Sequence, residues 1–484
     1  MPRRTLLPAI ALLLQLGCAA PLPLVDAGLW QDEASWLADP AREGRGLGSA
    51  GLAASAQHLA LRFDAAGLAP GAPDGTFFQS FRMPVAIRVE AAQLSFGAKT
   101  LARDRDYCVL LSSESGRFAG PLVFAGYGLQ DSESGRDDWA GLDARNAIVL
   151  VLEGGSGLPS RRGATLLAAR EHGARALLFA PVPGEHANAA EPTLEDPPGA
   201  NPTRLDSGVV ALALSRAAAE KLAARAGLDL GALARAAEHR FRPSLHGASV
   251  SGEVRIARDE GMVANVVGRL PGNEPALAHE QIVIGAHYDH VGRGEFGSQR
   301  PGSAPAIHPG ADDNASGAAG LVALARALSV APRPARTLVF IAFTAEEAGL
   351  IGSAHYVAGA SDVAAMINLD MIGRLGAKGV TVFGAESGAG LADLVRASAE
   401  KRSLPVAFVR DDSQGPSDQA SFHAARIPAL LFHTGMHEAY HTPDDRAEAL
   451  VPGGAARVLA LVADVALALA NAEVRPAFAA TPPP

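Results

Sequence analysis

Five short clusters in this sequence hold histidine and carboxylate side chains, the groups that bind metal ions and move protons in hydrolytic sites. The clusters read AHYDHVG, GADDNASG, FTAEEAG, INLDMIG and AYHTPDD, and they contain His287, Asp313, Glu346, Glu347, Asp370 and His441. A hydrolytic zinc ion prefers imidazole and carboxylate ligands and needs an open position for water. Together the clusters predict a metal site.

The number of candidate ligands indicates two metal ions rather than one. Five side chains are suitable, namely those of His287, Asp313, Glu347, Asp370 and His441. Two ions about 3.5–4 Å apart can share a carboxylate and a bridging hydroxide, so each ion receives three protein ligands if Asp313 bridges. Two zinc ions carry about four positive charges, which three carboxylates and one hydroxide nearly balance. We therefore expect two zinc ions per chain.

Two further carboxylates suit the same site. Asp289 lies two residues beyond His287, on the same side of an extended strand, and can accept the proton on the second imidazole nitrogen. Glu346 and Glu347 are adjacent, so at the start of a helix their side chains point about 100° apart. One of them can bind metal while the other faces the water and acts as a general base.

Each cluster taken singly has an ordinary structural explanation. Adjacent glutamates often begin a solvated helix, and a Gly-Ala-Asp-Asp-Asn turn is commonly an N-cap. The joint occurrence of all the clusters, each near a predicted strand end, favours the metal site. Other histidines lack this context and are expected to be structural, namely His355, His423, His433 and His437, and His308, just before PGADD, is expected to be a loop residue.

Short apolar runs next to the clusters predict buried strands. They are QIVIGA before His287, TLVFIAFT before Glu346, AAMINL before Asp370 and, further upstream, IPALLF before His441. These runs alternate with Ala-rich helical stretches, which predicts an α/β fold with a mostly parallel mixed sheet flanked by helices over residues 257–474. Ligands of such sheets bind outside the carboxyl ends of the strands, where distant residues can meet.

The sequence outside residues 257–474 has a different pattern of predicted helices and strands. Residues 21–82 contain the amphipathic helical stretch GLAASAQHLALRFDAAGL, and residues 83–256 consist of short strand-like runs with turns and one helix near 164–172. We expect residues 83–256 to form a separate β-rich module with an exposed loop, PGEHANAAEPTLEDPPGANPTR. Residues 475–484 are expected to be a disordered tail.

Composition limits the class of protein. The chain has 484 residues, 48% of them hydrophobic and 19% charged, which is typical of a globular protein with two domains. Its net charge of −9 provides no basic surface for nucleic acid, so we expect no nucleic-acid partner. The apolar stretch 454–470 contains Asp464 and is expected to pack within its domain rather than cross a membrane.

Residues 1–20 have the pattern of an export signal, with two arginines before an apolar stretch that is too short to span a bilayer. Cys18 resembles the acylated cysteine of bacterial lipoproteins, although Gln15 stands where that pattern has an aliphatic residue. Cleavage after Ala20 is the alternative. We expect an exported protein that is periplasmic, anchored to the outer membrane or secreted, with membrane attachment only through an acylated Cys18.

At these clusters the chain resembles the co-catalytic di-zinc aminopeptidases, a family that includes glutamate carboxypeptidase and the glutaminyl cyclases. Residues 83–256 resemble a protease-associated domain, with GYG, DDWAGLDARNAIVLVLEG and RALLFA in that domain's usual order. The segment AREGRGLGSAGLAASAQHLALRFDAAGLAPG resembles the helical lead-in of exported bacterial members. The resemblance implies a phosphorylase/hydrolase-like zinc-peptidase fold with an inserted protease-associated domain.

The resemblance also implies how the ligands divide. Residues that match His287 and Asp370 bind one zinc in the family, residues that match Glu347 and His441 bind the other, and the residue that matches Asp313 bridges them. The peptide bond after that aspartate is typically cis.

Catalytic roles follow from the same resemblance. The residue that matches Glu346 is the general base, and Tyr440 occupies the position of a tyrosine that donates to the oxyanion in some members. The implied reaction is hydrolysis of an N-terminal peptide bond by a bridging hydroxide, with peptide or protein N-termini as substrates.

Three alternatives make different predictions. Glutaminyl cyclases use a single zinc, and the intact ligand set argues against them. Carboxypeptidase-type and other amidohydrolase relatives would show a Gly-x-Asp-x-Lys-Gly type turn, whereas this chain has GADDNASG. A binding protein with a dead catalytic domain would have lost a ligand or the base. The carboxylates of Glu346, Asp370, Asp411 and Asp412 could bind a substrate α-ammonium, whereas Arg410 is the one cation in the loop that contains Asp411 and Asp412. This excess of carboxylates favours recognition of the amino end of the substrate.

Overall fold

The computed structural model places the chain in two compact units. It describes residues 25–110, 112–131, 135–153, 162–182, 207–240, 243, 245, 248–294, 296–300, 305–409 and 417–479. The first unit comprises Met1–Arg82, Met262–Gly294 and Gly302–Pro484, and the second comprises Met83–Gly261 and Glu295–Pro301. The predicted export signal and the predicted exposed loop lie outside the described residues.

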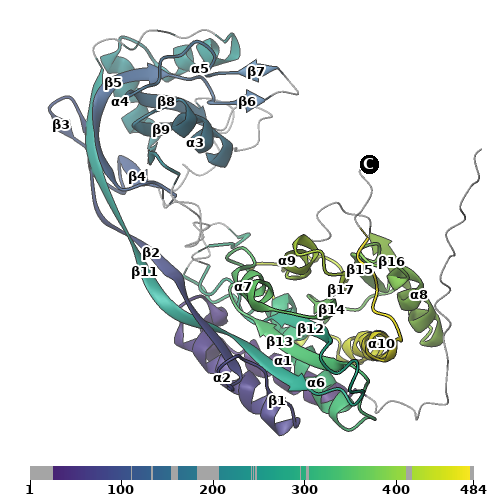
Figure 1. Ribbon diagram of the computed structural model, residues 1–484. Coiled ribbons are helices and arrows are strands. Elements are labelled where there is room, and N and C mark those ends of the chain that lie inside the picture. Colours follow the sequence, from purple (N-terminus) through teal and green to yellow (C-terminus); the bar gives the residue numbers. More distant parts are fainter. Residues whose placement is uncertain are drawn as a thin grey trace, which may run out of the picture. The chain divides into compact units, whose positions relative to one another are not determined.

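The core of the first unit is a mixed, mostly parallel sheet (Figure 1). Its strand order is β16 (Val406–Val409), β15 (Val380–Phe383), β17 (Ala429–His433), β14 (Val363–Leu369), β12 (Gln281–His287), β13 (Thr337–Phe343) and the end of β11 (Ser249–Leu270). Strands β17, β14, β12 and β13 are parallel, whereas β15 and β11 run antiparallel to β17 and β13. Every residue of β13 and β14 is buried, which explains why these strands are continuous apolar runs.

Helices pack against this sheet. Helices α6 (Gly317–Ser329) and α10 (Pro452–Asn471) contact β12, β13 and β14, and α1 (Ala27–Leu37) contacts both helices. Helix α7 (Ile351–Gly359) contacts α9 (Gln419–Ala424), which lies against β14 and β17, and α8 (Leu391–Lys401) contacts α10 and β16. The α/β fold with a mostly parallel mixed sheet flanked by helices is confirmed.

Helix α10 is long and apolar enough to cross a membrane by length and composition, and it is the one such helix among the described residues. However, 61% of its most apolar window is buried inside the protein. Its carboxylate Asp464 pairs with Arg402 at 2.6 Å. These contacts are those of a core helix, as its sequence predicts.

The N-terminal segment belongs to the first unit. After α1 come the short turn η1 (Pro40–Arg45) and α2 (Ala50–Ala65), which begins where the side chain of Ser49 accepts the N–H of Leu52. Strand β1 (Ala69–Pro70) then pairs with β11. The helix predicted in this segment is therefore confirmed as α2.

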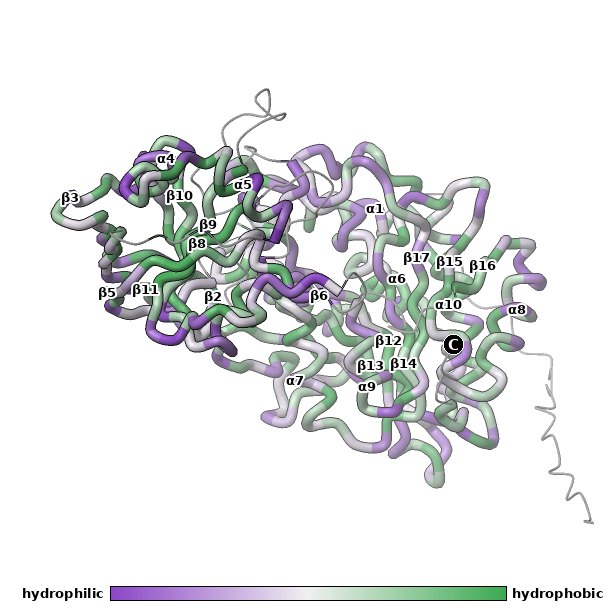
Figure 2. Tube along the Cα trace, turned by 90° about the horizontal axis from the view of Figure 1, so that it is seen from above, coloured by the Kyte–Doolittle hydropathy of each residue, from purple (hydrophilic) through white to green (hydrophobic). Residues whose placement is uncertain are grey.

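In the second unit the strand order is β11, β5 (Gly116–Phe124), β8 (Ile148–Glu153), β9 (Ala176–Pro181), β10 (Val210–Leu214) and β4 (Tyr107–Val109). The four strands from β5 to β10 are parallel, and β8 and β9 are strongly hydrophobic (Figure 2). The 19-residue strand β2 (Phe78–Phe96) pairs with β11 and β3 (Lys99–Thr100). The remaining short elements are β6 (Gln130–Asp131), β7 (Arg136–Asp137) and η3 (Ala447–Ala449).

Two expectations about local structure need correction. Besides the predicted helix α3 (Arg162–Glu171), the second unit contains α4 (Arg216–Arg225) and α5 (Leu230–Glu238), which have Ala-rich sequences and begin at the N-caps Ser215 and Asp229. The expectation of a β-rich module with one helix was wrong in this respect. Residues 475–479 of the expected tail are ordered, because Phe478 forms a β-bridge with Gly388, and residues 480–484 lie outside the described residues.

Candidate metal centre

The predicted ligands come from the ends of neighbouring strands. His287 ends β12 and lies opposite Phe343, which ends β13 in the parallel register. Glu346 and Glu347 follow shortly after β13, and Asp370 directly follows β14. The two other ligands come from connecting segments: Asp313 from η2 (Ala311–Ser316) immediately before α6, and His441 from the loop after β17.

Asp313 lies between the two predicted histidines. Its Oδ1 is 3.3 Å from Nε2 of His287, and its Oδ2 is 2.9 Å from Nε2 of His441. Oδ1 of Asp370 lies 3.6 Å from Nε2 of His287, and Oε2 of Glu347 lies 3.2 Å from Nε2 of His441. Two groups of ligand atoms therefore share one carboxylate, and each group adds one imidazole and one further carboxylate.

This arrangement fits metal ligation. Among the described residues, Oδ2 of Asp313 and Oδ1 of Asp370 are buried and accept no aligned hydrogen bond, although imidazole nitrogens lie close to both. Buried polar atoms are normally hydrogen-bonded, so these oxygens lack the partner that burial requires. A divalent cation bound by imidazole and carboxylate would supply that partner.

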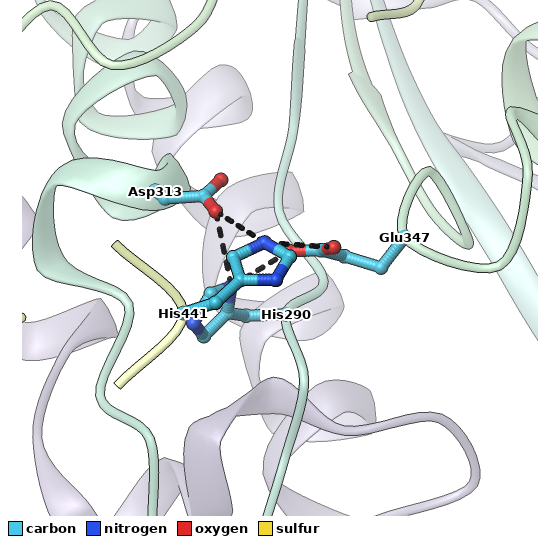
Figure 3. Close-up of side chains that lie close together, drawn as sticks. All are labelled: His290, Asp313, Glu347 and His441. Atoms are coloured by element: carbon cyan, nitrogen blue, oxygen red, sulfur yellow. Dashed lines mark hydrogen bonds and ion pairs between the residues drawn. The ribbon is translucent and has the colours of Figure 1, made fainter. Parts of the chain in front are cut away.

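His290 also belongs to the cluster, and the sequence did not predict it (Figure 3). Its buried Nδ1 lies 2.8 Å from Oε1 of Glu347 and 3.6 Å from Oδ2 of Asp313. Its ring meets the ring of His441 edge to face, with 5.3 Å between the centroids. His290 is the second histidine of AHYDHVG, but it lies three residues beyond the end of β12, where the alternation of the strand no longer fixes the direction of a side chain.

In the metal-free protein, the two predicted histidines are held as cations. Burial alone would lower the pKa of His287, but the carboxylates of Glu346 and Asp370 raise it well above its ordinary value. Burial opposes the charge of His441 as well, yet Glu347 and Asp313 raise the pKa of His441 to about 11.

The carboxylates that face these imidazoles shift in the opposite direction. Burial would raise the pKa of Asp313, but His290, His287 and His441 hold it well below its ordinary value. Burial and Asp313 likewise favour the neutral form of Glu347, but His441 and His290 lower the pKa of Glu347 to about 2. The metal-free site therefore consists of ion pairs whose protons a cation would displace.

Glu346 behaves unlike its neighbour. Burial raises the pKa of Glu346 well above its ordinary value, and the charges of Glu347 and Asp418 add to this effect against the opposing His287. The two glutamates lie in a turn, because Ala345 has a φ of 57° and α7 begins only at Ile351. The expected helix start at the glutamates was therefore wrong.

Asp289 fixes this turn. Its Oδ1 accepts the N–H of Glu346 at 3.1 Å, and its Oδ2 accepts the N–H of Glu347 at 3.3 Å. Nδ1 of His287 lies 3.2 Å from the backbone oxygen of Asp289 and 3.8 Å from its carboxylate. The expected hydrogen bond from imidazole to carboxylate is replaced by one to the backbone, because the two amides occupy the carboxylate. Asp289 thus links one histidine to both glutamates.

A buried network behind Asp313 was not predicted. Oδ2 of Asp445 accepts the N–H groups of Asp312 and Asp313 at 2.9 and 3.1 Å, and Oδ1 of Asp445 pairs with Arg374 at 2.6 Å. Nε2 of His437, which was expected to have no role near the site, lies 3.3 Å from Oδ2 of Asp312. These contacts hold the backbone beside the peptide bond after Asp313, which is cis as the family resemblance implies.

A fully buried arginine from the N-terminal segment joins two loops of the site. The guanidinium of Arg45 donates at 2.7–2.8 Å to four backbone oxygens, those of Leu37, Tyr288, Pro309 and Gly310. Burial lowers the pKa of Arg45 to about 10, although Asp313 and other carboxylates of the site oppose this. The loop after His287 and the loop before Asp313 are therefore tied to one side chain.

Tyr440 lies beside the ligand His441, with 3.9 Å between the stacked ring centroids. Burial raises the pKa of Tyr440 above its ordinary value, and Asp313 adds to this, so the hydroxyl remains protonated and able to donate. The loop carboxylates Asp411 and Asp412 and the neighbouring Arg410 lie outside the described residues.

Comparisons with known proteins agree with this chemistry. Residues 265–466 match the model of peptidase family M28. Aminopeptidase YwaD of Bacillus subtilis strain 168 is 32% identical over 199 residues, which cover 38% of this chain and 40% of that protein. A probable zinc metalloprotease of Pyrenophora teres f. teres is 38% identical over 116 residues, 23% of each chain. The matched stretch is thus less than half of the length of each of these relatives.

Solved structures share the fold over more of the chain. The aminopeptidase from Aneurinibacillus sp. strain AM-1 aligns with 95% of this chain and 97% of its own, with a TM-score of 0.61 and 24% identity. The zinc aminopeptidase BSAP from Bacillus subtilis aligns with 92% of this chain and 95% of its own, with a TM-score of 0.59 and 22% identity. At these identities the likeness concerns the fold.

Proposed function

We propose that the protein is a zinc-dependent aminopeptidase with two metal ions in one site, since residues 265–466 match the model of peptidase family M28. The relatives that are named as aminopeptidases and zinc metalloproteases support this choice. The observation that carries the proposal is the position of Asp313, since its two oxygens face two different histidines, each of which has a further carboxylate beside it.

Five residues would hold the ions. His287 and Asp370 would bind one ion, Glu347 and His441 would bind the other, and Asp313 would bridge them. When bound, such a pair supplies a shared hydroxide as the nucleophile and polarises the scissile carbonyl.

Glu346 would act as the general base. It is adjacent to the ligand Glu347, and its buried carboxylate has a raised pKa in the metal-free protein, so it binds a proton more readily than an ordinary glutamate. It would take a proton from the attacking water and return it to the leaving amine. Tyr440, which stacks on His441, would donate its hydroxyl proton to the developing oxyanion. Asp289 would position His287 and the glutamate turn rather than touch the substrate.

Charge favours the amino end of the substrate. Glu346 and Asp370 offer carboxylates for an α-ammonium, whereas a carboxypeptidase needs a cation for the α-carboxylate. Among the described residues, the two arginines beside the site are already engaged, Arg45 by backbone oxygens and Arg374 by Asp445. Peptide or protein N-termini are therefore the proposed substrates.

The test combines metal analysis with matched substrates. The purified chain should hold two zinc equivalents and should cleave aminoacyl anilides with a free amino group, but it should leave their N-acetylated counterparts almost untouched. Equal rates on both substrates, or release of C-terminal residues first, would indicate a carboxypeptidase or other amidohydrolase on the same metal pair. A single zinc equivalent after saturation would refute the pair itself.

The parts outside the peptidase domain also have proposed roles. Residues 1–20 would direct export to the periplasm, the outer membrane or the medium, and residues 83–256 would form a protease-associated domain that controls access of large substrates. The mass of the mature N-terminus distinguishes acylation at Cys18 from cleavage after Ala20.

A further inference from the structure

His290 is held in one orientation by its surroundings. The side chain is fully buried, and its backbone N–H donates to the oxygen of Arg45 at 3.2 Å. Gly310, with a φ of 55°, lies directly against the ring, since a Cβ atom at this position would come within 2.3 Å of Cδ2 of His290. The imidazole therefore packs against bare backbone three residues before Asp313.

The two oxygens of Glu347 have different partners (Figure 3). Oε2 lies 3.2 Å from Nε2 of His441, on the side where that nitrogen also approaches Asp313. Oε1 lies 2.8 Å from Nδ1 of His290. Only one of the two carboxylate oxygens thus faces the proposed metal position, and the other is occupied by an imidazole.

The direction of the hydrogen bond between His290 and Glu347 follows from the acceptor. Oε1 of Glu347 is a carboxylate oxygen, which accepts and does not donate, so the N–H at Nδ1 of His290 is the donor. Nε2 of His290 is buried and has no hydrogen-bond partner among the described residues.

The carboxylate of the other metal position faces its imidazole in a comparable way. Oδ1 of Asp370 lies 3.6 Å from Nε2 of His287 and, among the described residues, is buried without an aligned hydrogen-bond partner. A ligand that a donor already holds through its second oxygen loses less conformational freedom on binding metal. The hydrogen bond from His290 therefore favours metal binding by Glu347.

We propose that His290 is a positioning residue which donates from Nδ1 to Oε1 of Glu347, restricts that ligand to binding through Oε2, and strengthens metal binding at the position formed with His441. This inference rests on the proposed metal pair. Because Asp370 and His287 do not contact His290, the effect should be confined to one of the two metal equivalents.

Three substitutions distinguish hydrogen bonding from other roles. The amide nitrogen of asparagine can occupy the place of Nδ1, whereas that of glutamine reaches the place of Nε2. Zinc affinity of the full-length, metal-depleted protein is measured by competition with a chromophoric chelator. His290→Ala and His290→Gln should weaken one equivalent by about 10–100-fold and leave the other unchanged. His290→Asn should stay within a few-fold of the wild type.

His433→Ala serves as the matched control, because His433 is a buried imidazole on β17 that accepts the N–H of Gly435 and does not belong to the ligand cluster. This variant should bind both equivalents like the wild type.

The outcomes separate the alternatives. Unchanged affinity in His290→Ala overturns the proposal, as does an asparagine variant as weak as the alanine variant, since His290 would then ligate metal itself or merely fill space. The visible spectrum of the cobalt-loaded protein adds a second readout, because His290→Asn should leave it unchanged only if His290 is not a ligand. A wild type that takes up a single equivalent would instead refute the metal pair. If His290→Ala does not fold, the difference in zinc affinity between His290→Asn and His290→Gln still tests the proposal.

Discussion

The same substitution at two neighbouring positions, Glu346→Gln and Glu347→Gln, should change the stability of the metal-free protein in opposite directions. The ionised carboxylate of Glu347 lies between His290 and His441, and its pKa is lowered from 4.5 to about 2. A lowered pKa means that the charged form stabilises the folded state at every pH above 4.5, and that this contribution disappears as the pH falls from 4.5 through 2. At 1.36 kcal/mol per pKa unit, the contribution is about 3 kcal/mol.

The charge of Glu346 has the opposite effect on stability. Its pKa is raised above its ordinary value, so the folded state is penalised once this carboxylate ionises. A neutral amide removes that penalty. At pH 7 in the presence of a chelator, Glu347→Gln should therefore lower the thermal midpoint by a few degrees, whereas Glu346→Gln should leave it unchanged or raise it.

The metal-loaded protein provides the second half of the test. Glu346→Gln should retain both zinc equivalents and lose turnover by about 10²–10⁴-fold, because proton transfer is lost and the ligands are not. Glu347→Gln should lose one zinc equivalent. Equal destabilisation by both substitutions in the chelator, or loss of zinc in Glu346→Gln, would refute the assignment of a ligand and a base to this pair.

Three other predictions concern the same structure. The metal-free protein should be most stable between about pH 4.5 and 6.5 in thermal unfolding. The stabilisation by charged His441 is fully present below pH 6.5 and is lost as the pH rises through its pKa of about 11, whereas the stabilisation by ionised Glu347 is lost on acidification. His441→Gln should therefore reduce the loss of stability at alkaline pH. Asp445→Asn should weaken zinc binding, because the neutral side chain pairs less strongly with the partly buried Arg374 and accepts less strongly from the N–H groups of Asp312 and Asp313. Unchanged zinc affinity would exclude a role of Asp445 in holding Asp313. Residues 98–248 can be replaced by a short turn, because the N–H of Gly97 already donates to the backbone oxygen of Ser249 at 3.0 Å. The shortened protein should hydrolyse small anilides at the wild-type rate but long peptides at a changed rate. Wild-type rates on both kinds of substrate would exclude substrate gating by this module.

The sequence predicts β12, β13, β14 and β17 well because each is a short apolar run followed by polar residues. Burial of β13 and β14 on both faces makes that signal strong. The same logic places His287 and Asp370 at the edge where they meet, since parallel strands present their carboxyl ends on one side. Glu346 is harder to place, because Ala345 turns the chain with a positive φ that no periodicity announces.

Residues that support the site escape prediction for a different reason. Asp445 lies 133 residues from Asp312, and their hydrogen bond depends on a tertiary arrangement with no local pattern. His290 lies in a cluster that the sequence singles out, but whether its imidazole turns inward depends on space at Gly310. Helices α4 and α5 were predictable in principle, because Ala-rich stretches follow the capping residues Ser215 and Asp229.

Arg45 sets a limit on how this protein can be divided. The stretch that matches the peptidase family begins at residue 265, yet the loop oxygens of Tyr288, Pro309 and Gly310 are satisfied by a side chain more than 240 positions upstream. A fragment of residues 265–466 would leave buried carbonyl groups without donors, at about 1–3 kcal/mol each. The ligand-bearing loops and the N-terminal segment therefore depend on each other for folding. Exchange of the ligand-bearing segment between relatives should succeed only when the segment around Arg45 is exchanged with it.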